Sequence, residues 1–122
     1  MGLIAPINLK MKAAAEYAEG IALFNEGRYF ECHEAWERLW LRTEGEERAF
    51  LHAMIQMAAA LHHLERGNMK GATSIHARAQ ARLAALPQIM MGLDARAFAE
   101  AMRAHFDGAA AGRPQIKMQT SS

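Results

Sequence analysis

Apolar residues along the chain recur mostly at intervals of three and four positions, which is the spacing of helices that bury one face. Turn residues divide this pattern into five stretches. The predicted helices cover residues 9–26, 29–42, 43–66, 68–86 and 94–107. No stretch alternates convincingly between apolar and polar residues at period two, so the sequence predicts an all-α fold.

Short local signals mark the helix ends. Asn8 is a candidate N-cap for the first helix, and Gly27 is expected to end it. Thr43 followed by Glu46 resembles a capping box at the start of the third helix, which is expected to end at Gly67. These signals predict short connections between antiparallel neighbours.

A faint repeat links the two glycine turns. Gly27 and Gly67 lie 40 positions apart, and a new helix is predicted directly after each of them. The expected architecture is a compact bundle of about five helices built from two stacked antiparallel helical hairpins, much as in tetratricopeptide-like proteins. Residues 1–107 form one predicted domain, and the small and polar residues of 108–122 predict a flexible C-terminal tail.

Length and cysteine content narrow the class of protein. The 122 residues suit a single domain. Cys32 is the only cysteine, which excludes an internal disulfide and a multi-cysteine zinc site and favours a reducing cytoplasm. The apolar run at residues 54–61 is too short to span a bilayer and contains Gln56, so no membrane association is expected.

Charge is distributed unevenly along the chain. Residues 1–66 carry seven Lys or Arg and ten Asp or Glu, whereas residues 67–122 carry seven and three, so the halves have net charges of −3 and +4. The basic residues are dispersed and not interleaved with aromatic residues, which disfavours nucleic-acid binding. Arg78 and Arg82 form a basic pair about one turn apart, for which a solvated helix face is expected and a phosphate clamp is the alternative.

The stretch YFECHEAWERLW, residues 29–40, carries the most distinctive chemistry. On a helical wheel of about 100° per residue, His33 and Glu37 fall between two groups of apolar side chains. We expect them to point inward as a buried pair, because a buried carboxylate needs a partner. Glu34 lies at the margin of this arc. The opposite face is predicted to be solvated and consists of Glu31, Ala35, Arg38 and Arg42.

The third predicted helix is apolar almost all round, but one polar stripe runs along it. We expect this stripe to face His33 and Glu37 on the preceding helix. His62 is predicted to point about 100° away from its neighbour in the stripe, so that the two cannot face the same site. The stripe consists of His52, Gln56 and His63.

Three interpretations of this polar cluster stay open. The first is a structural hydrogen-bonded network. The second is a site for a zinc-like divalent metal with His33, Glu37 and His63 as ligands, because imidazole and carboxylate at i, i+4 spacing can bind one ion. The third is acid–base catalysis by His33, Glu34 and Glu37, although no nucleophile stands out. Trp40 is a candidate for stacking on a ligand.

Two long stretches resemble a family of small bacterial and archaeal helical proteins known as domain of unknown function 309. The resemblance covers about residues 20–86 and rests on FNEGRYFECHEAWERLW and on FLHAMIQMAAALHHLERGN, followed by Gly71 and Ala72. It implies a compact helical bundle and no assigned function. The motif positions that it carries over are Gly27, Phe30, Glu31, His33, Glu34, Glu37, Trp40, Gln56, Gly67 and Asn68.

The sequence therefore favours a small cytoplasmic binding or interaction module without enzymatic activity, centred on a buried His/Glu cluster. Its partner would be a protein or a small molecule, and the methionine-rich apolar residues are compatible with self-association. Gln56, Trp40 and Asn68 are expected to belong to the cleft. The alternative is a metal-dependent, hydrolase-type enzyme that acts on a small molecule through His33 and Glu37, together with the neighbouring glutamate.

Overall fold

The computed structural model describes residues 9–110 and 112–119 and contains the expected helices together with a short β-hairpin. Strands β1 (Ile89–Met90) and β2 (Leu93–Asp94) pair antiparallel. The all-α prediction is confirmed, and the hairpin is an addition that the sequence did not predict. The helices are α1 (Leu9–Asn25), α2 (Tyr29–Trp40), α3 (Gly45–Glu65), α4 (Met69–Ala84) and α5 (Ala95–Phe106).

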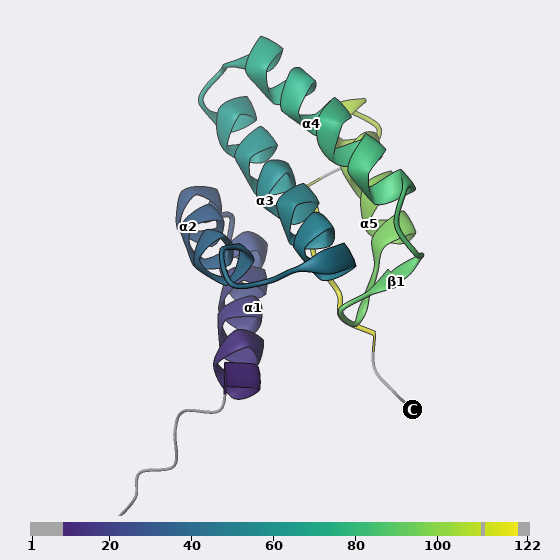
Figure 1. Ribbon diagram of the computed structural model, residues 1–122. Coiled ribbons are helices and arrows are strands. Elements are labelled where there is room, and N and C mark those ends of the chain that lie inside the picture. The colour runs from purple at the N-terminus through teal and green to yellow at the C-terminus, as the bar shows by residue number, and fades with distance from the viewer. Residues whose placement is uncertain (1–8, 111, 120–122) are drawn as a thin grey trace, which may run out of the picture.

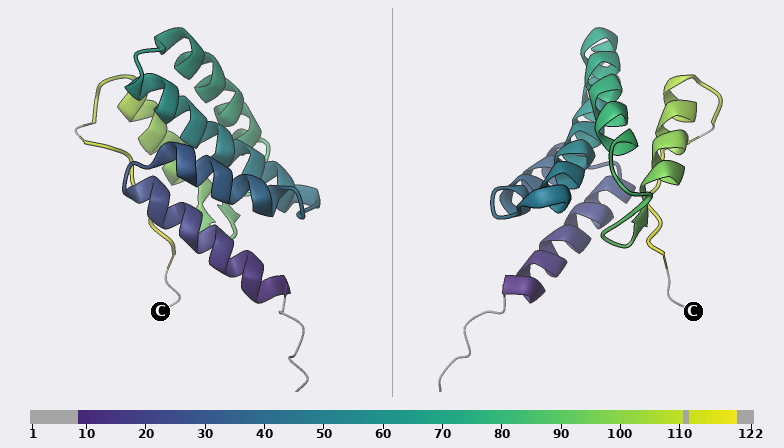
Figure 2. Two further views of the ribbon diagram at one scale, coloured as in Figure 1. Left: turned by 90° about the vertical axis from the view of Figure 1, so that its left-hand side faces the viewer. Right: turned by 45° about the vertical axis from the view of Figure 1, so that its right-hand side comes forward.

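Helices α1 to α4 form a row in chain order, and each packs roughly antiparallel against the next (Figure 1). α5 lies on one face of this row, with the C-terminal segment beside it (Figure 2). The core fills the space between them. Phe24 of α1 contacts Phe98 of α5 with ring centroids 5.5 Å apart, and Trp36 of α2 is fully buried. On the face of the row opposite α5, α3 is partly exposed between α2 and α4.

Glycine turns end α1 and α3, as the sequence predicts. Gly27 and Gly67 have φ angles of 78° and 79°, in the left-handed region that favours glycine. Asn68 then caps α4, because its side-chain oxygen accepts a hydrogen bond from the Gly71 N–H at 3.0 Å. The two helical pairs, α1 with α2 and α3 with α4, therefore have short connections.

The predicted capping box at the start of α3 is wrong. Thr43 Oγ1 donates a hydrogen bond to the Leu39 carbonyl oxygen at 2.7 Å, at the end of α2. α3 begins at Gly45, and its N-cap, Glu44, makes no side-chain capping hydrogen bond. The hydroxyl is thus used by the preceding helix and is not available to the following one. Asn8, the predicted cap of α1, lies outside the described residues.

The face of α2 that was predicted to be solvated is only partly so, because Arg38 and Arg42 are exposed as predicted but Ala35 is buried. Ala35 is 1% exposed, and Arg38 and Arg42 both form ion pairs with Glu16 of α1. Glu16 is itself buried. α1 and α3 therefore cover two flanks of α2, and the flank that carries the His–Glu pair is left open.

The C-terminal segment returns to the N-terminal half of the molecule. Asn25 Nδ2 donates to the Ile116 carbonyl oxygen at 3.0 Å, and the Ile116 N–H donates to Asn25 Oδ1 at 2.7 Å. Ile116 is buried, and Met118 forms a bridge with Leu93 of β2. Residues 113–119, within the stretch predicted as a flexible tail, thus lie against the domain.

Among the helices that the structure describes, none is long and apolar enough to cross a membrane.

Candidate functional site

A groove runs over α3 between α2 and α4, which we call the α2–α4 groove. α2 and α4 both pack on α3 and lie on opposite sides of it (Figure 1). The larger cavity in this groove has a volume of about 260 Å³. α2 contributes His33, Glu37 and Trp40 to its lining, and α4 contributes Ile75. α3 forms the floor with His52, Ile55, Gln56 and Ala59.

A second cavity of about 210 Å³, lined by α2 and α3, continues the groove toward the start of α2. His33 and Ala59 line both cavities, so the two adjoin. His62 and His63 both line the second cavity, with ring centroids 6.2 Å apart. The expectation that these neighbours cannot share a site is wrong, because a wide cavity admits side chains that diverge. The remaining lining residues are Tyr29 and Phe30.

The His33–Glu37 pair lies at the rim of the groove. His33 Nδ1 is 3.9 Å from Glu37 Oε2, and the side chains are 35% and 54% exposed. The prediction of a buried pair is therefore wrong. Because both side chains remain in contact with water, neither requires the other to offset a large desolvation cost. Both groups are available to a ligand that enters the cavity.

Trp40 and its surroundings form the end of the groove near the α2–α3 connection. The Arg48 guanidinium carbon lies 4.2 Å from the Trp40 ring centroid, and the His52 ring centroid lies 5.6 Å from that of Trp40. Burial lowers the pKa of His52 below its ordinary value of 6.5, and the positive charges of Arg82 and Arg48 lower it further. His52 is therefore neutral at neutral pH and offers one donor and one acceptor nitrogen.

Gln56 ties the floor of the groove to its α4 wall. Arg82 Nε donates a hydrogen bond to Gln56 Oε1 at 3.0 Å. At the far end, Asn68 Nδ2 lies 3.1 Å from His63 Nδ1, a hydrogen-bond distance that links the α3–α4 turn to the second cavity. Glu34 is exposed and lines neither cavity. Of the predicted site residues, Asn68 therefore contacts the second cavity only through His63, and Glu34 lies on α2 beside the groove, one turn before Glu37.

The candidate metal ligands do not form a preorganised cluster. Within residues 9–110 and 112–119, no group of three or more His, Cys, Asp or Glu side chains is placed to hold a metal ion. Cys32 is buried in the core, and burial raises the pKa of its thiol above the ordinary value. This thiol is therefore protonated and serves as an apolar core group.

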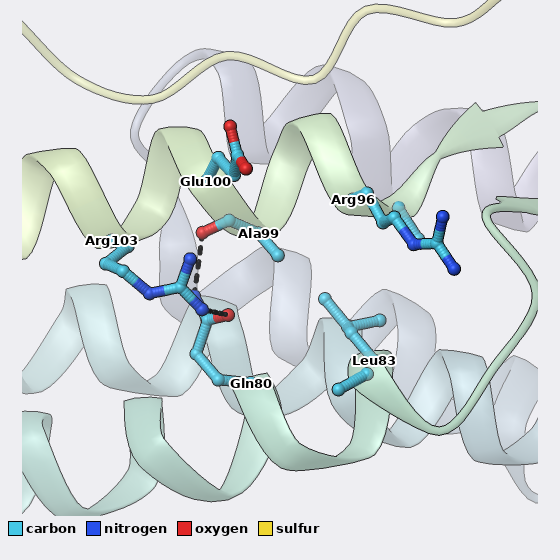
Figure 3. A pocket seen from close by; sticks show the side chains of 8 residues that line it. Gln80, Leu83, Arg96, Ala99, Glu100 and Arg103 are labelled. Atoms are coloured by element: carbon cyan, nitrogen blue, oxygen red, sulfur yellow. Dashed lines mark hydrogen bonds between the residues drawn. The ribbon is translucent and has the colours of Figure 1, made fainter.

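Another cavity, of about 200 Å³, lies between α4 and α5 and was not anticipated from the sequence. Gln80 is held there by two hydrogen bonds, since its Nε2 donates to the Ala99 carbonyl oxygen at 2.7 Å and its Oε1 accepts from Arg103 Nη2 at 2.9 Å. Figure 3 shows Leu83 between Arg103 and Arg96, with the Arg96 guanidinium directed away from Arg103. The polar groups of this cavity are thus largely used to join the two helices.

The groove residues that sequence reasoning missed are apolar or basic. Ala59 lies three positions after Gln56, on the same stripe of α3, and that spacing could have identified it. Ile75 lies seven positions before Arg82 on α4, which is also a same-face spacing. Arg48 and Trp40 lie on different helices, so no spacing along one helix could have predicted their contact.

Comparison with known proteins identifies the family. Residues 17–75 match the family model described as Domain of unknown function (DUF309). The fold is similar to the crystal structure of a conserved hypothetical protein from Thermus thermophilus, with 38% sequence identity over 75% of this chain and 95% of that chain and a TM-score of 0.67. The chain belongs to the DUF309 family. Among curated proteins, no significant match was found.

The DUF309 match coincides with the groove. Residues 17–75 include all of α2 and α3 and reach Ile75 of α4, which lines the larger cavity. α5 and the C-terminal segment lie outside the matched range. The part of the chain that defines DUF309 therefore contains every residue that lines the two cavities of the α2–α4 groove.

Proposed function

We propose that this protein is a binding module and that the α2–α4 groove is its binding surface. The observation that carries the proposal is the pair of adjoining cavities over α3, which share His33 and Ala59. An open concavity with apolar walls and a few convergent polar groups is the usual form of a binding site. Tyr29 and Ile55 join the groove to the hydrophobic core, while His33, Glu37 and Gln56 are not buried and are available to a ligand.

The chemistry of the groove suits binding better than bond cleavage. Ile55, Ala59 and Ile75 offer apolar contact, while His52 supplies a neutral imidazole. The side chains that line the two cavities include no serine, threonine, cysteine or lysine beside the His33–Glu37 pair. A covalent mechanism would therefore have no nucleophile of these kinds within the groove.

The test uses small aromatic probes and the NMR amide spectrum of the full chain. Phenol, benzamidine and benzoate are titrated separately, and the shifted amide signals are mapped. Ala59→Arg places a large side chain where the two cavities meet and should remove the shifts on α2 and α3. The matched control, Ala81→Arg, changes an exposed alanine on α4 that lines neither cavity and should leave them unchanged. Shifts that persist in Ala59→Arg, or that lie outside the groove, would contradict the proposal.

The alternative function is metal-dependent hydrolysis of a small molecule, and the 3.9 Å approach of His33 to Glu37 beside an open cavity favours it. Elemental analysis of protein purified without chelator distinguishes it from simple binding. About one equivalent of a zinc-like metal, lost in His33→Ala, would support a metal site. Protein that neither carries nor takes up metal would exclude this alternative.

A further inference from the structure

We infer that the occupant of the α2–α4 groove is an amphipathic helix of a partner protein, with acidic residues along one edge of its apolar stripe and basic residues along the other. This inference rests on the proposed binding function and specifies its ligand. Its basis is the shape of the groove and the opposite charge of its two walls.

The shape of the groove matches a helix. Its α2 wall is 12 residues long, so it offers a track of about 18 Å, or about three helical turns. The two cavities adjoin at His33 and can receive apolar side chains spaced three, four or seven residues apart on one partner helix. Phe30, at one end of the track, lies beside the His62 ring with centroids 5.9 Å apart, and its 56% exposure leaves apolar surface for contact with a bound helix.

The backbone of the groove excludes recognition by strand addition. Both walls and the floor are α-helices, whose backbone hydrogen bonds are satisfied internally. An extended peptide would therefore find no exposed sheet edge with which to pair. A helix needs none, because its contacts are made by side chains alone.

The two walls carry opposite charge. On α2, Glu37 is 54% exposed at the rim, and the exposed Glu34 lies one turn earlier. On α4, Arg82 donates a hydrogen bond to Gln56 of the groove floor, and the exposed Arg78 lies one turn earlier. The acidic groups beside the groove thus lie on α2 and the basic groups on α4, apart from Arg48 of α3, whose guanidinium lies over the Trp40 ring at one end.

These charges do not neutralise each other. Among the ion pairs of the described residues, none joins α2 to α4. A helix that carries lysines toward α2 and glutamates toward α4 would satisfy both walls at once. Such complementarity selects partners and orients them, because like charges brought together are penalised.

Three synthetic peptides of about 15 residues test the inference, each long enough to follow the groove as a helix. All share one leucine stripe. The mixed peptide has lysines on one edge and glutamates on the other, the acidic peptide has glutamates on both, and the basic peptide has lysines on both. Fluorescence anisotropy with the full chain should show the mixed peptide binding at least about tenfold more tightly than the others at low salt. Added salt should reduce the difference.

Charge reversal of each wall gives the decisive comparison. Glu34→Lys with Glu37→Lys makes both walls basic and should transfer the preference to the acidic peptide. Arg78→Glu with Arg82→Glu makes both walls acidic and should transfer it to the basic peptide. Glu100→Lys, on α5 and outside the groove, is the matched control and should retain the preference for the mixed peptide.

Each outcome separates the inference from the function on which it rests. Equal affinity for the three peptides, or a preference that the wall variants do not change, overturns the charge-matched helix. If no peptide binds while the aromatic probes still shift the groove amides, the occupant is a small molecule and the binding function stands. If neither peptides nor probes bind, both the inference and the proposed function are wrong.

Discussion

At the scale of single residues, the surroundings of each ionisable group decide whether it serves the fold or the groove. Glu37 keeps about half of its side chain in water and makes only a loose contact with His33. Glu16 is almost fully buried and lies between two arginines. An exposed carboxylate contributes little to stability and is free to bind, whereas a buried one must be paired.

Glu16 gives the first prediction. Glu16→Gln preserves the side-chain size but removes the charge that Arg38 and Arg42 face. We expect the free energy of unfolding, measured by urea denaturation, to fall by about 1–2 kcal/mol, because a buried charge-assisted contact is lost. Glu19→Gln removes an exposed partner of Arg38 and should change stability by less than about 0.5 kcal/mol. Equal losses in the two variants would contradict this assignment.

His76 gives a prediction about pH. Its ring stacks on Phe106 with centroids 4.1 Å apart, and its Nε2 lies 3.0 Å from Gln80 Nε2. It therefore faces α5 and not the groove. Burial, reinforced by the charge of Arg103, lowers the pKa of His76 below its ordinary value of 6.5, while Asp107 opposes the shift.

The sign of the pH effect follows from this shift. Below about pH 6.5 the unfolded chain takes up a proton at His76 that the folded chain resists, so stability falls as the pH drops toward the folded pKa. His76→Gln should reduce the difference in urea midpoint between about pH 7.5 and about pH 5.5. Part of the difference should remain, because the pKa of His52 is lowered too. A pH dependence identical to that of the unmodified protein would show that His76 does not contribute.

At the scale of helices, the contact between α1 and α2 depends on the absence of one side chain. Gly20 lies directly against the Trp36 ring, which occupies the space that a Cβ would need. The ring is held in place because Trp36 Nε1 donates a hydrogen bond to the Tyr17 carbonyl oxygen at 3.2 Å. Two helices can approach this closely only where one of them presents a glycine.

Gly20→Ala tests this contact. Alanine is the better helix former by about 1 kcal/mol, so propensity alone predicts stabilisation. The clash with Trp36 should outweigh this gain, with a net loss of about 1–3 kcal/mol and a changed near-ultraviolet circular dichroism signal. Ala22→Gly, at an exposed position of the same helix, should lose about 1 kcal/mol with no change in that signal. A stabilised Gly20→Ala variant would show that the ring moves aside at little cost.

At the scale of the whole molecule, the C-terminal segment joins parts of the chain that are distant in sequence. Asn25 forms two hydrogen bonds with the backbone of Ile116, 91 positions away. Ile116 is buried at this contact, and Met118 bridges to the hairpin that precedes α5. The segment therefore links α1 to the α5 side of the core and leaves the α2–α4 groove uncovered.

Asn25→Ala should release this segment. Loss of both hydrogen bonds should lower the free energy of unfolding by about 2 kcal/mol and accelerate trypsin cleavage after Lys117. Gln115→Ala removes a single exposed hydrogen bond to the Asn25 carbonyl oxygen and should have a much smaller effect on both measurements. Cleavage at an unchanged rate in Asn25→Ala would mean that other contacts hold the segment.

The sequence by itself determined the helices, most of their ends and the family. Apolar spacing and the left-handed turns at Gly27 and Gly67 are local properties, and local properties can be read without the fold. The polar stripe on α3 was also predictable, because residues seven or eleven positions apart share a helix face whatever surrounds them. Gln56 belongs to that stripe and lines the larger cavity of the groove.

Only the tertiary structure decided which face of each helix is covered. A helical wheel gives the angle between His33 and Ala35, but not the direction in which α1 and α3 lie. Ala35 is buried against α1, and His33 stands at an open rim, which is the reverse of the sequence expectation. The course of the C-terminal segment was equally unpredictable, because its hydrogen bonds to Asn25 join residues whose proximity leaves no periodic signal. Exposure and long-range contact depend on what packs against a residue, and that is a property of the assembled fold.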